Sequence, residues 1–261
     1  MRLRRITQHI KDQNWTAIGI DFVIVVLGVF LGIQLGNWNQ SRMNQDAAQA
    51  SLERLHVELQ TIERSAQNNI DMGQLIAGHI SDAITAIQSN PAAIEDGSDF
   101  AIDVYFAGYQ LLSPIGPNGS SEAIKSDDFT HLRDAQMRQE IVRFNKLVAL
   151  QGSSLDKTTP ILPALRRHMP VDVIEQVREG CSRASIGRVD EGGANQFELP
   201  ETCPPPLTQE QIERTAASFR KGQVLPDLRE TLSIIRRQID TYRLLKAEAK
   251  TLAKKIEESR R

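Results

Sequence analysis

The feature that most constrains this chain is an uninterrupted apolar segment near its N-terminus, residues 17–36. It reads AIGIDFVIVVLGVFLGIQLG and carries one charge, that of Asp21. As an α-helix rising about 1.5 Å per residue it would be about 30 Å long, which matches the hydrocarbon core of a bilayer. The alternative, a buried core helix of a soluble protein, seldom needs so long an apolar run. The segment therefore predicts a transmembrane helix.

The flanking residues predict how this helix sits in the membrane. Tryptophan prefers the headgroup zone, and one tryptophan stands outside each end of the segment. Four basic residues precede it (Arg2, Arg4, Arg5 and Lys11), whereas Arg42 is the one basic residue that closely follows it. The positive-inside rule then predicts a cytoplasmic N-terminus, residues 1–16, and an extracytoplasmic region, residues 37–261. In a Gram-negative bacterium these are the two sides of the inner membrane, with residues 37–261 in the periplasm. The residues expected at the membrane interface are Trp15, Trp38, Arg4 and Arg5.

A cleaved signal peptide is the competing interpretation of the same segment. Its apolar region would be about 7–15 residues long and closely followed by a small-x-small cleavage site. Here the apolar run is longer, and the nearest such site, Ala48-Gln49-Ala50, lies well beyond it. We therefore interpret the segment as an uncleaved signal anchor.

One face of the predicted helix carries small residues and an acid. Gly28, Gly32 and Gly36 recur every four residues, a spacing that lets two helices approach closely in lipid. Asp21 lies two helical turns before Gly28 and so shares this face. We predict that these four residues contact another helix, from a second copy or another membrane protein; the alternative is that glycine is simply common in membrane helices. For Asp21, three roles stay open: a solvated edge residue, an interhelical hydrogen bond, or a proton-relay carboxylate.

The rest of the sequence has the pattern of packed helices. Residues 44–90 and 225–259 both carry apolar or small residues in alternating steps of three and four, which is a heptad seam. Residues 91–222 between them read as short helices and loops broken by proline and glycine. The first seam comprises Leu52, Leu55, Leu59, Ile62, Ala66, Asn69, Gly73, Ile76, Ile80, Ala83 and Ile87.

Composition agrees with this pattern, because aromatic residues make up only 5% of the chain and a core of Leu, Ile, Val and Ala suits helices. We therefore predict an all-α fold, with an N-terminal transmembrane helix followed by an extracytoplasmic bundle that contains long, antiparallel, coiled-coil-like helices. Whether the first seam packs on its own chain or on a partner's copy stays open.

The two cysteines bound a loop that is rich in glycine and proline, residues 180–206. A disulfide between Cys181 and Cys203 would stabilise the fold by about 3 kcal/mol in the chain-entropy model. The periplasm permits such a bond and the cytosol does not, so the predicted topology favours it. Two free thiols are the alternative. Zinc is not expected, because no histidine or third cysteine lies at ligand spacing.

Two short stretches resemble a known family. Gln13-Asn14-Trp15, followed by the acid-containing apolar segment and Asn37-Trp38-Asn39, is similar to the start of an uncharacterised family of bacterial single-pass membrane proteins. Residues 121–144 are similar to the middle motif of that family. The chain departs from the pattern at Gln40, where an acid is expected, and in its cysteine-bounded loop. The resemblance implies the topology and the helical fold, and it implies no site residues.

No catalytic or cofactor-binding motif is recognisable in the sequence. The five histidines are scattered, and no glycine-rich phosphate loop is present. The near-balance of 31 basic and 33 acidic residues gives no electrostatic case for nucleic-acid binding. We therefore expect no enzyme, no cofactor and no metal site.

The predicted function is that of a membrane-anchored helical scaffold or protein-interaction module of the bacterial envelope. Its expected partners are the lipid bilayer and either a second copy or another membrane protein. The alternative is a periplasmic-side subunit of an ion-coupled membrane transducer that uses Asp21. Against the transducer, the external region lacks the alternating strands expected of such a domain.

Overall fold

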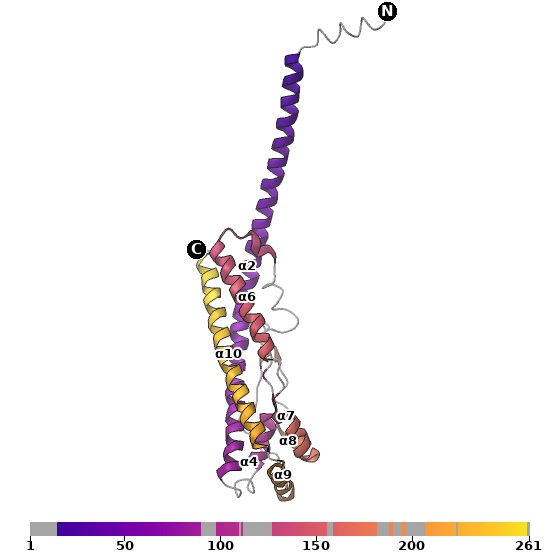
Figure 1. The fold of residues 1–261 in the computed structure, drawn as a ribbon, viewed down its shortest axis with the longest axis vertical. Helices are drawn as coiled ribbons and strands as arrows, with labels where there is room; N and C mark the ends of the chain where they lie inside the picture. The colour runs from indigo at the N-terminus through magenta and orange to yellow at the C-terminus, as the bar shows by residue number, and fades with distance from the viewer. Residues whose placement is uncertain are drawn as a thin grey trace, which may run out of the picture.

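One very long helix organises the molecule (Figure 1). In the computed structural model, α2 runs without a break from Trp15 to Ser89 and so includes both the apolar segment and the first seam. The connecting residues, 37–47, contain neither proline nor glycine, so nothing in them interrupts the helix. The prediction of a helical protein with a long N-terminal apolar helix is confirmed. The structure describes residues 15–89, 98–109, 111, 127–155, 159–181, 188–189, 195–196, 207–222 and 224–259.

Shorter helices and a second long helix follow α2. They are α4 (Ser98–Ala107), the 3-10 helix η1 (Asp127–His131), α6 (Ala135–Leu155), α7 (Ile161–His168), α8 (Val171–Cys181), α9 (Gln209–Lys221) and α10 (Leu225–Glu258). Within the loop predicted between the cysteines, β1 (Arg188–Val189) and β2 (Asn195–Gln196) pair antiparallel, with Arg188 opposite Gln196. Strands of two residues are too short to leave an alternating pattern in a sequence, so this pairing was not predicted.

The seams of α2 and α10 face each other within one chain. The ring Nδ1 of His56 lies 3.2 Å from the carbonyl oxygen of Ala253. Further along α2, Gly73 lies against Ile239. Residue numbers fall along α10 as they rise along α2, so the two helices are antiparallel, and the C-terminal end of α10 lies beside the middle of α2 (Figure 1). The first seam therefore packs on its own chain.

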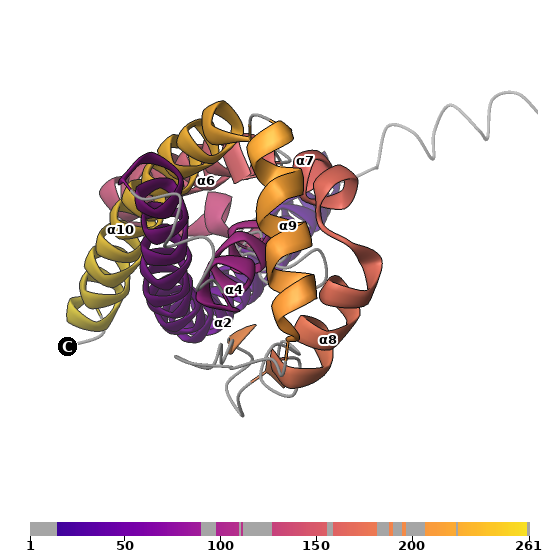
Figure 2. The same ribbon diagram turned by 90° about the horizontal axis from the view of Figure 1, so that it is seen from below.

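The core is divided into two clusters along the length of α2. Near the apolar segment, α2, α6 and α10 contribute buried residues such as Leu59, Phe144 and Leu252. At the far end, α4 packs on α2 and also contacts α7, α8 and α9, which cover it from the other side (Figure 2). Within the far cluster, between Ala66 and Ile70 on α2, the fully buried Asn69 donates from Nδ2 to the carbonyl oxygen of Ser65 at 2.8 Å. A polar side chain thus occupies the position where the first seam has no apolar residue.

Side chains with oxygen acceptors begin two of the helices. Asp134 accepts hydrogen bonds from the backbone N–H groups of Gln136 and Met137 at 2.8 and 3.0 Å, which caps the first turn of α6. Thr208 and Gln211 form a reciprocal capping box at the start of α9. Asp134 belongs to the turn between η1 and α6, which lies at the end of the bundle nearest the apolar segment.

Candidate functional site

The N-terminal part of α2 stands apart from the rest of the chain. Among the described residues it is the one helix long and apolar enough to cross a membrane, and none of its apolar window is buried against the protein. All but four of the large, exposed hydrophobic side chains in the described ranges lie between Ile20 and Met43; the four are Val57, Val142, Val171 and Leu244. A core helix of a soluble protein would be buried, so this exposure favours a membrane-spanning helix.

The predicted glycine face is open in the structure. Successive residues of an α-helix are turned by about 100°, which places Gly28, Gly32 and Gly36 within a sector of about 80°. Apart from the neighbouring backbone of its own helix, a Cβ atom added at any of the three would have nothing within 4 Å. Asp21 lies in the same sector and is exposed. The structure thus brings these four residues onto one face of α2, and among the described residues none contacts that face from another element.

This face points away from the bundle that the chain forms around α2. Leu55 and Leu59, which are fully buried against the other helices, are turned by about 160° from the centre of the glycine face. Exposed residues continue the glycine face outward on the same side of α2; they are Asn39, Met43, Ala47 and Ala50. Another helix could therefore lie along this side of α2 without meeting the α10 seam of the same chain.

Only some of the other predicted site residues lie within the described ranges. Trp38 is exposed at the end of the apolar segment, and Trp15 is the first residue of α2. Arg4 and Arg5 lie outside the described residues. Cys181 is buried at the C-terminal end of α8, whereas Cys203 lies outside the described residues, so the disulfide stays a prediction.

A partly buried polar pair that the sequence did not predict joins α4 to α2. Nδ1 of His79 lies 2.7 Å from Oδ1 of Asp103, and the imidazole stacks on the ring of Phe106 at a centroid distance of 4.7 Å. Burial raises the pKa of Asp103, and the hydrogen bond with His79 partly opposes this shift. The two residues come from different helices and belong to no motif, so no local sequence signal could have indicated the pair. The contact orients α4 on α2.

A second unpredicted group is the carboxyl of Glu58 on α2. Burial raises its pKa to about 8, and its buried Oε1 has no hydrogen-bond partner among the described residues. The carboxyl is therefore largely protonated at neutral pH. In sequence, Glu58 looks like one more member of a charged helix face, and no local pattern distinguishes it from the exposed acids there.

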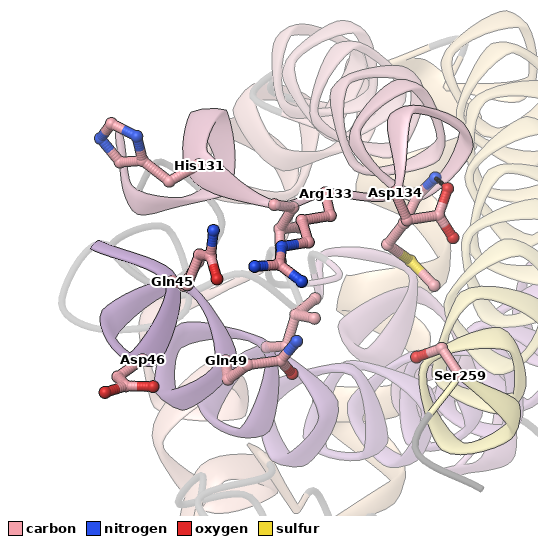
Figure 3. Close-up of a pocket in the computed structure, with 11 residues that line it drawn as sticks. Gln45, Asp46, Gln49, His131, Arg133, Asp134 and Ser259 are labelled. Carbon is pink, nitrogen blue, oxygen red and sulfur yellow. Dashed lines mark hydrogen bonds between the residues drawn. The ribbon is translucent and has the colours of Figure 1, made fainter. Parts of the chain in front are cut away.

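A cavity of about 320 Å³ opens at the end of the bundle nearest the apolar segment (Figure 3). Its walls are the beginning of the bundled part of α2, the turn between η1 and α6, and Ser259 at the end of α10. Its base consists of buried apolar side chains, which are Ala48, Leu52, Leu132 and Met137. At the mouth, Arg133 points between Gln45 and Gln49 (Figure 3).

The described residues offer no metal centre, because none of them form a group of three or more His, Cys, Asp or Glu side chains placed to hold an ion. Compared with known protein families, with curated proteins and with solved structures, the chain matches none. The resemblance of residues 13–39 and 121–144 to a family of single-pass membrane proteins therefore stays an expectation.

Proposed function

We propose that this protein is a membrane-anchored helical scaffold that self-associates through α2 and holds its bundle at a fixed position outside the bacterial inner membrane. The observation that carries the proposal is the open face of Gly28, Gly32 and Gly36 on a helix that continues unbroken into the bundle. In lipid, helices associate where small residues let their backbones approach, since lipid tails supply no hydrophobic driving force between helices.

The proposed partner is a second copy in parallel orientation. Two copies in one membrane present the same glycine face at the same depth, so a symmetric contact brings Gly32 of each chain together. Asn39, Met43 and Ala50 would extend that contact beyond the membrane, because they are exposed on the same side of α2. The seam of α10 is already covered within the chain, so it does not compete for this contact.

The proposed topology places residues 1–16 in the cytoplasm and the bundle in the periplasm. Support comes from the basic residues before the apolar segment and their scarcity just after it. In that compartment Cys181 and Cys203 would be free to form the proposed disulfide.

A photo-crosslinking experiment in membranes tests the self-association. A photoreactive amino acid in place of Met43, on the proposed contact side, should give a crosslinked dimer in the otherwise wild-type chain. Gly32→Ile should abolish the dimer band, because a branched side chain separates the two backbones. Gly19→Ile is the matched control, since Gly19 is also open but is turned by about 180° from Gly28. It should leave the band unchanged.

An unchanged dimer band in Gly32→Ile would remove the glycine face from the proposal. Equal loss in both variants would mean that bulky residues disturb membrane insertion rather than a specific contact.

Asp21→Asn adds a test of the second candidate function, an ion-coupled transducer, which is favoured by the position of Asp21 on this same face. A scaffold should tolerate that change, whereas a proton-coupled function should be lost.

A further inference from the structure

The cavity at the membrane-proximal end of the bundle combines an apolar base with polar groups at its mouth. Leu52, Leu132 and Met137 are each less than a tenth exposed and form the base. A volume of about 320 Å³ is at the lower end for ligand pockets, which suits one or two residues of a peptide better than a large ligand. The apolar base would favour an aliphatic group.

The guanidinium of Arg133 at the mouth suits a ligand with a single carboxylate, and the lining also includes the carboxyl groups of Asp46 and Asp134. Arg133 is exposed, and no carboxylate among the described residues is paired with it. Oδ1 of Asp134 already accepts the two hydrogen bonds that cap α6, and Asp46 points away from the centre of the cavity (Figure 3). A single carboxylate would pair with the guanidinium in the usual bidentate geometry. The two acids nearby disfavour a multiply charged anion such as phosphate.

The amides at the mouth favour a peptide over other carboxylates. Gln45 and Gln49 lie on either side of Arg133, one helical turn apart on α2 (Figure 3). A primary amide both donates and accepts hydrogen bonds, which is what an adjoining peptide group requires. A fatty acid presents a carboxylate and an aliphatic chain but offers no peptide group to these side chains.

The distance of the cavity from the membrane excludes lipid headgroups as its occupant. Gln45 lies nine residues beyond Gly36 in the same unbroken helix, which corresponds to about 13 Å along the axis. The headgroup layer on one side of a bilayer is only about 5–8 Å thick. Headgroups of a membrane spanned by residues 17–36 would therefore end below the mouth of the cavity.

We infer that this cavity binds the free C-terminus of a peptide that ends in an aliphatic residue, with the terminal carboxylate on Arg133 and the last side chain on the apolar base. Chain-end carboxylates are a recurring target of peptide-recognition sites. The inferred site lies on the bundle, so binding of a peptide is independent of the dimer contact proposed for the glycine face.

Fluorescence anisotropy with the full-length protein in detergent micelles tests this inference. The probe is the N-terminally labelled hexapeptide Gly-Ser-Gly-Ser-Ala-Leu with a free carboxyl end. The same peptide with a C-terminal amide should bind at least tenfold more weakly, and so should the free-acid peptide to Arg133→Gln. Arg236→Gln is the matched control, because Arg236 is also exposed but lies more than twenty residues before Ser259 on α10. It should bind the free-acid peptide as the wild type does.

Three results would overturn the inference. They are equal binding of the acid and amide peptides, unchanged binding in Arg133→Gln, and no measurable binding of the free-acid peptide. Octanoate serves as a competitor and tests the other source of an aliphatic carboxylate. If octanoate displaces the peptide at a lower concentration than unlabelled peptide does, the cavity belongs to fatty acids and the peptide assignment is wrong.

Discussion

At the scale of single residues, the polar groups inside the bundle matter more than those on its surface. Exposed ion pairs such as Arg143 with Glu248, 2.8 Å apart, contribute little to stability in water. A carboxyl that burial keeps protonated instead makes the stability depend on pH. Glu58 is such a group, because its pKa in the folded state is about 8 whereas its ordinary value is 4.5.

Glu58→Gln should remove this dependence. Between about pH 4.5 and pH 8 the folded state retains a proton that the unfolded state has lost, so the free energy of unfolding of the wild type falls as pH rises through this range. At pH 8 the variant should be more stable than the wild type by about 1 kcal/mol, a value reduced for the partial exposure of Glu58. At pH 4.5 the two should be nearly equal.

Denaturant unfolding of both proteins in micelles at the two pH values measures the effect. Glu53→Gln, on the exposed side of the same helix, is the control and should change stability equally at both. The prediction is wrong if the stability difference between Glu58→Gln and the wild type is the same at pH 8 as at pH 4.5. That result would show that the carboxyl of Glu58 is ionised in the folded state.

At the scale of elements, the close approach of α2 and α10 depends on a glycine. A Cβ atom added to Gly73 would lie 2.7 Å from Cγ1 of Ile239 and 3.0 Å from Cδ1 of Leu111, both in the packed core. Five residues further along α2, Gly78 is exposed, and a Cβ atom there would meet nothing within 4 Å. The two glycines have the same helix propensity and opposite surroundings.

Alanine at these two positions should therefore have opposite effects. Gly78→Ala should raise the free energy of unfolding by about 0.5–1 kcal/mol, since alanine favours the helix. Gly73→Ala should lower it by about 1 kcal/mol, because overpacking of a core costs about 1–3 kcal/mol and outweighs the gain in propensity. Denaturant unfolding of both variants compares them directly, and an equal rise in stability would mean that α10 can move away at little cost.

How much of these elements the sequence predicts depends on whether the pattern is local. The apolar segment, residues 17–36, was predictable from its length and composition, and each of the two seams was predictable from the spacing of apolar residues along a single helix. The link between His79 and Asp103 and the cavity around Arg133 are formed by segments far apart in the chain. Their geometry follows from how α4, α6 and α10 pack on α2, which no local pattern encodes. The pairing of β1 with β2 was missed for a different reason, namely its length.

At the scale of the whole molecule, the apolar segment and the bundle have separate requirements. The apolar segment has no buried residues and needs lipid or another helix. The bundle closes its seams within one chain, and its core clusters begin at Ala48. Folding of the bundle should therefore not depend on the segment that precedes it.

A fragment that begins at Asn37 should accordingly be a soluble, helical monomer. Its thermal unfolding midpoint should lie within about 3 °C of that of the bundle in the full chain, since no core contact is removed. Circular dichroism measures the midpoint, and analytical ultracentrifugation measures the mass. A fragment that stays dimeric would indicate that the bundle, rather than the glycine face, drives association.

Because α2 is unbroken, it also fixes the rotation of the bundle relative to the glycine face of the apolar segment. In a continuous helix each residue advances the chain by about 1.5 Å and turns it by about 100°. In the proposed dimer, the number of residues between Gly36 and Ala48 would therefore set the angle between the bundle and the line that joins the two membrane helices. Adding or removing one residue there would change the distance of the bundle from the membrane by only about 1.5 Å but would rotate the bundle by about 100°. The length of this short polar stretch would therefore determine how the bundles of two associated chains are oriented.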